Sequence, residues 1–206
     1  MSTTRRQRAW MFLSLLLVLP MAALAHHDHG DKGSRGLRNV TVLIVRHAEK
    51  PASGNGLSSQ GEQRAQAYAS YFDPLRLDGQ SLLPGRLIAT RDSKASIRPR
   101  LTLTPLSQRL GLPIEQPYAD ADVDKLVKSL GKDNQAPVVL IAWHHGHIDK
   151  LIEAFGGDAK AITGRKSWPG DVYDWLVVLR FDDHGRLLAP RSQLVQEHLL
   201  PGDGAG

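Results

Sequence analysis

Arg46 and His47 are the neighbouring residues of this 206-residue chain whose types and position could most directly do chemistry. They follow residues 40–45 (V-T-V-L-I-V), an apolar run that is too short for a membrane span and has no helical period. Such a run predicts a strand buried on both faces, as in a parallel sheet. Ligands of open α/β sheets bind at the carboxyl ends of these strands. At that place a guanidinium can bind an anion and a neutral imidazole can act as a nucleophile.

A helix is predicted after the Gly-, Ser- and Asn-rich loop at residues 51–56. Ser58 or Ser59 can cap its first turn, and the helix continues through Phe72. Gly61 lies early in this helix, where glycine lowers helix propensity. We therefore expect the backbone at Gly61 to approach a loop or a ligand closely.

Taken together, a strand ending in Arg-His and a helix opening with Leu-Ser-x-x-Gly-x-x-x-Ala (residues 57–65) resemble the histidine phosphatase superfamily, also called phosphoglycerate mutase-like. The resemblance spans residues 40–180. It implies an α/β fold, a three-layer α/β/α sandwich with a mostly parallel central sheet. It also implies a metal-independent phosphomonoester hydrolase without a cofactor, in which His47 forms a phosphohistidine and Arg46 binds the phosphate.

The segment after the next predicted strand, residues 87–90, supplies a second arginine. The family usually has a serine-rich turn here, then an arginine and, four residues later, a threonine. Arg98 and Thr102 fit this spacing, with Ser93 in the turn as a substrate-binding residue. Arg100 competes with Arg98 for the role, and Pro99 is compatible with a helix only in its first turn. The alternative is that these basic residues merely solvate a helix start.

A second histidine is expected where the buried strand at residues 138–143 ends. The family typically has Ser-His-Gly at this point, and His145-Gly146 matches it, whereas the downstream isoleucine favours His144. Because side chains alternate at a strand end, only one of the two should face the pocket. We assign His145 to catalysis and His144 to substrate binding. The alternative, a metal site that also includes His147, lacks further ligands with recognisable spacing, so no metal is assigned.

The proton donor for the leaving group stays open at this stage. Glu49 is close to His47 and is assigned to substrate binding, although it could instead pair with Lys50 or a loop amide. Carboxylates in the regions where the family places its general acid are Glu115, Asp120, Asp122, Asp124 and Asp149, and Asp92 lies in the arginine loop. None of them lies in a motif that identifies it.

The first 25 residues have the three regions of a secretory signal peptide: arginines, the apolar stretch 9–19, and Ala23-Leu24-Ala25. We expect cleavage after Ala25 and a periplasmic or secreted product without a membrane segment, with an uncleaved anchor as the alternative. Residues 26–37 are expected to form a flexible His-rich tail, which could instead bind a metal. The domain is expected to span residues 38–200. With 0 cysteines, no disulfide forms.

Composition limits the choice of partners. Of 26 Lys and Arg, three lie in the leader, which leaves 23 against 21 Asp and Glu, a net charge of about +2. This balance does not support nucleic-acid binding. The expected partner is a small phosphorylated substrate or a phosphoprotein, and the oligomeric state is open. Two alternatives remain: a phosphoglycerate mutase-type transferase, which must exclude water and usually has longer insertions, and a non-catalytic phosphate-, phosphoprotein- or metal-binding protein.

Overall fold

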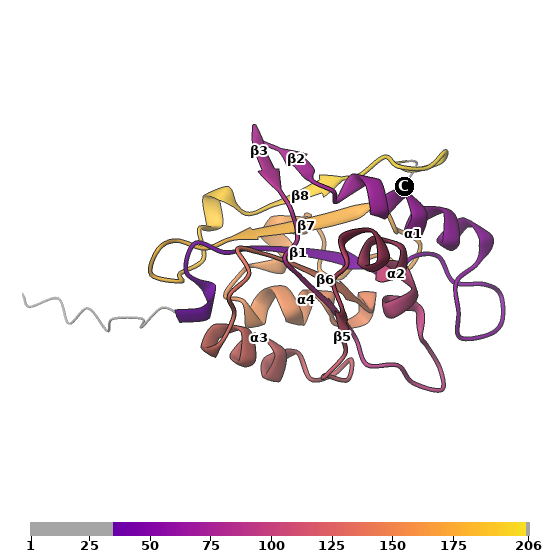
Figure 1. Cartoon of the computed structure of the whole chain (residues 1–206), viewed down its shortest axis with the longest axis horizontal. Helices are drawn as coiled ribbons and strands as arrows, with labels where there is room; N and C mark the ends of the chain where they lie inside the picture. Colours follow the sequence, from indigo (N-terminus) through magenta and orange to yellow (C-terminus); the bar gives the residue numbers. More distant parts are fainter. Residues whose placement is uncertain (1–34, 205–206) are drawn as a thin grey trace, which may run out of the picture. The chain divides into compact units, whose positions relative to one another are not determined.

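A six-stranded sheet forms the centre of the computed structural model, which describes residues 35–204 (Figure 1). The strand order is β5-β4-β6-β1-β7-β8. Strands β5, β4, β6 and β1 run parallel, β7 is antiparallel to β1, and β8 is antiparallel to β7. The strands are β1 (Thr41–Arg46), β4 (Arg86–Ala89), β5 (Ile114–Glu115), β6 (Val138–Trp143), β7 (Trp175–Arg180) and β8 (Gln193–Gln196).

Helices cover both faces of this sheet because alternate strand residues point to opposite sides. Leu43 and Val45 pack into a core with α1 and α2, whereas Val42 and Ile44 pack into a second core with α3 and α4. The helices are α1 (Ser59–Tyr71), α2 (Arg98–Leu110), α3 (Val123–Lys132), α4 (His145–Ala154) and α5 (Ala159–Thr163). The predicted three-layer α/β/α sandwich with a mostly parallel sheet is therefore confirmed. None of the helices within residues 35–204 is long and apolar enough to cross a lipid bilayer.

Gly61 is a point of close backbone approach, as predicted. Ser58 caps α1 by accepting a hydrogen bond from the Gly61 amide at 3.1 Å. A Cβ atom added to Gly61 would lie 2.4 Å from the carbonyl oxygen of Glu49. The absence of a side chain therefore lets the start of α1 pack directly on the loop that follows His47.

Several elements differ from the expectation. Strands β2 (Leu75–Leu77) and β3 (Gln80–Leu82) form a separate hairpin that was not predicted. The helix after β6 begins at His145, a residue that was expected to lie at the strand end. Past residues 182–185 the chain makes a single bridge between Phe181 and Leu187, and a 3-10 helix, η2 (Ala189–Arg191), then precedes β8.

The domain boundaries also differ from the expected residues 38–200. A short 3-10 helix, η1 (Arg35–Leu37), precedes β1, and Leu37 is buried in the core that contains α3. At the other end, Asp203 forms an ion pair with Arg64 of α1 at 2.7 Å. The described domain therefore includes residues that were assigned to the tail and to the region beyond residue 200. Residues 1–34, on which the predictions of a signal peptide and of most of the tail fall, lie outside the described residues.

Candidate active site

The carboxyl ends of β1 and β6 bring the two histidine-bearing segments together. These strands are parallel neighbours whose register pairs Arg46 with Trp143. The amide of His47 donates to the carbonyl oxygen of Trp143 at 2.9 Å, which holds the two chains together just past the strand ends. The side chains that follow each strand therefore meet at one edge of the sheet, where open α/β sheets bind ligands.

His47 is held in an orientation suited to nucleophilic attack. The residue is only 3% exposed, and its Nδ1 lies 2.7 Å from the carbonyl oxygen of Ala48. A carbonyl oxygen can only accept, so the ring proton is assigned to Nδ1 and Nε2 keeps its lone pair. Burial lowers the pKa of His47 to about 3, and the charges of Arg46 and Arg98 act in the same direction. The imidazole is therefore neutral at neutral pH.

Arg46 is fully buried, yet its guanidinium is only partly satisfied. Its Nη1 donates to the carbonyl oxygens of Val172 at 2.9 Å and Pro169 at 3.3 Å, and its Cζ lies 3.7 Å from the centre of the Tyr173 ring. Its Nε and Nη2 have no hydrogen-bond partner among the described residues. Burial lowers the pKa of Arg46. Buried donors without partners are costly, so an anion bound here would satisfy them.

Arg98, and not Arg100, is the second arginine near His47. Burial lowers the pKa of Arg98, whose charge in turn lowers the pKa of His47. Its Nε is buried without a partner in the described chain, and its other contacts are long bonds of 3.3 and 3.5 Å to carbonyl oxygens. Arg100, in contrast, donates to the carboxylate of Asp92 at 2.7 Å. Arg98, and not Arg100, therefore has a guanidinium nitrogen that is free to bind an anion.

Thr102 connects this arginine to the loop after His47. The amide of Ala48 donates to the Thr102 hydroxyl at 2.8 Å, and that hydroxyl donates to the carbonyl oxygen of Arg98 at 2.8 Å. Pro99 lies in the first turn of α2, as the sequence required. Ser93 is exposed, and its hydroxyl bonds the backbone of Ser96 within its own turn. The structure therefore does not bring Ser93 into contact with the other predicted site residues.

His144 is the histidine whose ring contacts His47. The two ring centroids lie 5.1 Å apart in an edge-to-face arrangement with an interplanar angle of 71°. The assignment of His145 to this position assumed that both histidines extend the strand. Instead β6 ends at Trp143 and α4 begins at His145, so His144 occupies the N-cap between strand and helix. Burial lowers the pKa of His144.

His145 lies beside the pocket rather than against His47. It is half-buried, and its Nδ1 has no partner among the residues described. Burial lowers its pKa, and the charges of Arg46 and Lys50 act in the same direction. His145 therefore lies within electrostatic range of the site.

Glu49 has a structural partner in place of the predicted contact with substrate. Arg64 donates to both Glu49 carboxylate oxygens, from its Nη2 at 2.7 Å and from its Nε at 2.9 and 3.1 Å. Arg64 also pairs with Asp203, and these hydrogen bonds raise its pKa despite burial. The two carboxylates and the buried guanidinium connect the loop after His47 to the C-terminal segment.

A carboxylate–histidine pair beside His144 could not be singled out from the sequence. The Oδ2 atom of Asp120 lies 2.7 Å from Nδ1 of His147, and its Oδ1 is buried without a partner in residues 35–204. The Trp143 indole donates to the Asp120 carbonyl oxygen at 3.1 Å, which fixes the loop. The charge of Asp120 raises the pKa of His144 against the larger effect of burial. Asp120 was one of six candidates, and only the fold selects it.

The other candidate carboxylates are less well placed. Asp92 pairs with Arg100, Glu115 with Arg86, and Asp122 with Lys125. Asp149 is half-buried in α4, and burial raises its pKa. No group of three His, Cys, Asp or Glu side chains within residues 35–204 is arranged to hold a metal ion.

Tyr173 is a further site residue that the sequence did not reveal. It lies in the loop before β7, where the Arg46 guanidinium stacks on its ring. The centroid of this ring is 6.3 Å from that of the His47 ring. An isolated tyrosine in a loop has no spacing that predicts such a contact. A stacking aromatic ring favours arginine over lysine at position 46.

Comparison with solved structures places the fold. The chain is similar to a candidate alpha-ribazole-5'-P phosphatase from Escherichia coli, with a TM-score of 0.52, 13% identity, and coverage of 76% of this chain and 98% of that one. It is also similar to a phosphoglycerate mutase from Plasmodium falciparum, with a TM-score of 0.50, 14% identity, and coverage of 79% and 94%. No protein-family model and no curated protein sequence matches the chain. The chain therefore has the phosphoglycerate mutase-like fold that the resemblance implied.

Proposed function

We propose that this protein hydrolyses phosphate monoesters through a phosphohistidine on His47. The observation that carries the proposal is a buried, neutral imidazole, oriented by the Ala48 carbonyl oxygen, beside two guanidinium groups with unpaired donors. Phosphoryl transfer requires a positioned nucleophile and positive charge around the equatorial oxygens. The groups around His47 meet both requirements.

In the first step, Nε2 of His47 attacks phosphorus in line with the departing oxygen. The N–P bond forms as the P–O bond to the leaving group breaks, and the leaving oxygen takes up a proton. Arg46, Arg98 and His144 donate to the three equatorial oxygens. In the second step, water attacks phosphorus, the P–N bond breaks, and inorganic phosphate and neutral His47 are released. Neither step requires a metal ion.

We further propose that the Asp120–His147 pair supplies the proton to the leaving group. Oδ2 of Asp120 lies 2.7 Å from Nδ1 of His147, and the pair lies beside His144. In the first step, Asp120 transfers a proton to the leaving oxygen, and the carboxylate that remains accepts a hydrogen bond from the ring N–H of His147. Asp120→Asn should lower kcat for alkyl phosphates by at least about tenfold and affect p-nitrophenyl phosphate much less, because a good leaving group needs little protonation. Asp122→Asn, which alters a surface pair, is the matched control. Equal losses on both substrate classes would argue against this role for Asp120.

The substrate is proposed to be a small phosphorylated molecule or a phosphoprotein. A panel of phosphomonoesters, phosphoglycerates and a phosphohistidine peptide, each tested with the wild type and with His47→Asn, measures the activity directly. We expect phosphate release by the wild type alone, unchanged by EDTA. Isomerisation of phosphoglycerate without phosphate release would indicate the mutase instead. Activity that EDTA removes and zinc restores would contradict the proposal and would favour a metal site at His144, His145 and His147.

A further inference from the structure

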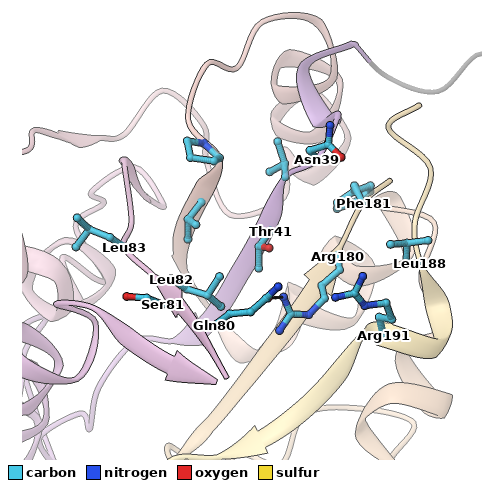
Figure 2. Close-up of a pocket in the computed structure, with 13 residues that line it drawn as sticks. Asn39, Thr41, Gln80, Ser81, Leu82, Leu83, Arg180, Phe181, Leu188 and Arg191 are labelled. Atoms are coloured by element: carbon cyan, nitrogen blue, oxygen red, sulfur yellow. Dashed lines mark hydrogen bonds between the residues drawn. The ribbon is translucent and has the colours of Figure 1, made fainter. Parts of the chain in front are cut away.

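A cavity lies at the amino-terminal end of β1, away from His47 at its carboxyl end. Figure 2 shows the residues that line it. Its volume is about 620 Å³, within the range of small-molecule sites. Its floor includes Thr41, the first residue of β1, whereas Arg46 is the last residue of that strand. At about 3.3 Å per residue, the two residues are roughly 17 Å apart. The cavity is therefore separate from the proposed catalytic site.

Two arginines line this cavity and are matched by one carboxylate. Arg180 of β7 is 5% exposed and donates to Gln80 at 2.5 Å and to Asp78 at 3.1 Å. Arg191 of η2 lies on the same side of the cavity in Figure 2 and forms no ion pair with any described residue. Two guanidinium groups against the Asp78 carboxylate leave one uncompensated positive charge. A single negative charge would balance it.

Thr41 places a hydroxyl without a partner at the floor of the cavity. The residue is only 8% exposed, and its hydroxyl forms no hydrogen bond to another residue in the described part of the chain. Since this hydroxyl is not among the buried polar atoms that lack a partner, it is open to the cavity and free to bond a partner there. A ligand atom in the cavity, such as a carboxylate oxygen, would provide one.

Most of the remaining lining residues are apolar, although Asn39, Gln80 and Ser81 also line the cavity. Leu82 and Leu83 lie on the side of β3, and Phe181 and Leu188 lie on the side of β7 (Figure 2). Leu83 is 49% exposed and is the one large apolar side chain that is exposed among residues 35–204. Apolar walls beside an unbalanced positive charge are typical of a site for a ligand with an acidic head and an apolar body.

We propose that this cavity binds a small amphipathic carboxylate. Its head would lie between Arg180 and Arg191 and accept a hydrogen bond from Thr41, and its apolar body would cover Leu82 and Leu83. A carboxylate matches the single unbalanced charge better than a doubly charged phosphate does. The volume of about 620 Å³ accommodates a free organic acid of this kind. This site is independent of the proposed hydrolysis.

Isothermal titration of the full chain with octanoate tests the proposal. We expect saturable binding at one site, whereas acetate, which lacks the apolar body, and octylamine, which has the opposite charge, should not saturate. Arg191→Gln and Thr41→Val should each weaken octanoate binding at least fivefold. Both substitutions avoid the buried Arg180 ion pair, so a folded protein is expected; circular dichroism verifies this.

Two controls make the outcome decisive. Arg76→Gln changes an exposed arginine of the same hairpin that does not line the cavity, and it should leave octanoate affinity unchanged. Arg98→Gln should also leave it unchanged, which excludes binding of octanoate at His47. Absence of saturation, equal binding of octylamine, or affinity that changes with Arg98→Gln but not with Arg191→Gln would overturn the proposal. Binding of an acidic peptide in preference to octanoate would indicate a protein-docking site instead.

Discussion

At the scale of single residues, the site holds positive charge that the described protein leaves unbalanced. Arg46 and Arg98 both have buried nitrogen atoms without partners, and burial lowers the pKa of both. Their charges and burial together keep His47 neutral. A bound phosphate dianion would accept hydrogen bonds from these nitrogen atoms and would balance the two positive charges. The site is thus preorganised to bind an anion, and it disfavours the protonated form of His47.

The spacing of motifs in the sequence was sufficient to predict some of these residues. Arg46, His47 and Arg98 follow from short motifs tied to a strand end or a helix start. The sequence favoured His145 over His144, whereas the His144 ring contacts His47, because α4 begins one residue after the strand and not several residues later. Asp120 and Tyr173 come from loops whose path is determined by tertiary packing, so no local pattern identifies them.

Substitution of the two arginines tests the assignment within α2. Arg98→Gln should lower kcat/KM for phosphomonoesters by roughly 100- to 1000-fold, because a preorganised charge donor to the transition state is lost. Arg100→Gln should lower it by less than about tenfold, since Arg100 is paired with Asp92. Steady-state kinetics on both variants measure the difference. A larger loss for Arg100 would show that the segment binds phosphate in another register.

Steady-state kinetics also distinguish the roles of His144 and His145. His144→Gln should reduce kcat by roughly 100-fold, because the ring that contacts His47 is removed. His145→Gln should reduce kcat by less than about tenfold, because the His145 ring does not lie against His47 and affects the site only through electrostatic interactions. If His145→Gln were the more damaging change, the strand-end arrangement would differ in the substrate complex.

At the scale of elements, the buried strands were the most predictable part of the fold. Apolar runs without helical period identified β1 and β6, and the pairing of these two strands brings the site together. The β2–β3 hairpin was missed because its strands are three residues each, too short for a period. Its Asp78-Gly79 turn, with φ of 51° and 73°, is the local signal that could have revealed it.

Glu197, just past β8, makes the stability of the fold dependent on pH. Burial raises its pKa from 4.5 to about 8, and the charges of Asp174 and Asp203 act in the same direction, whereas Tyr68 and Arg64 oppose it. The folded state therefore favours the protonated carboxyl. The resulting stabilisation is complete below about pH 4.5 and is lost as the pH rises to about 8.

Urea unfolding of the wild type and Glu197→Gln at several pH values tests this dependence. The free energy of unfolding of the wild type, relative to the variant, should fall between pH 4.5 and pH 8. Taking the difference removes the contribution of His47, whose lowered pKa acts in acid. Glu62→Gln, at an exposed position of α1, is the control and should show no such slope. A constant difference between wild type and Glu197→Gln would contradict the burial of a protonated carboxyl.

At the scale of the whole molecule, contacts between residues far apart in the sequence hold the loops around His47 in place. Arg64 joins Glu49, in the loop after His47, to Asp203 near the C-terminus. Neither this connection nor the stack of Arg46 on Tyr173 has a sequence pattern, because each joins segments more than a hundred residues apart. The two ends of the central strands then carry separate sites, the proposed catalytic site and the proposed carboxylate site.

Export is a property of the whole chain that stays a prediction. The leader's three regions predict cleavage after Ala25. Expressed in a Gram-negative host, the protein should be recovered from the periplasm with His26 as its first residue, as determined by N-terminal sequencing. Recovery from the membrane fraction with Met1 retained would support the alternative of an uncleaved anchor.

The central claim, that His47 carries the phosphoryl group, is tested most directly by trapping the intermediate. Wild-type protein mixed briefly with a 32P-labelled monoester and quenched should carry a label that is stable in alkali and labile in acid, as expected for a phosphoramidate. Mass spectrometry should place the label on His47. His47→Asn should carry none, and Arg100→Gln should label normally. A label on another residue, or phosphate release by His47→Asn at the wild-type rate, would contradict the account.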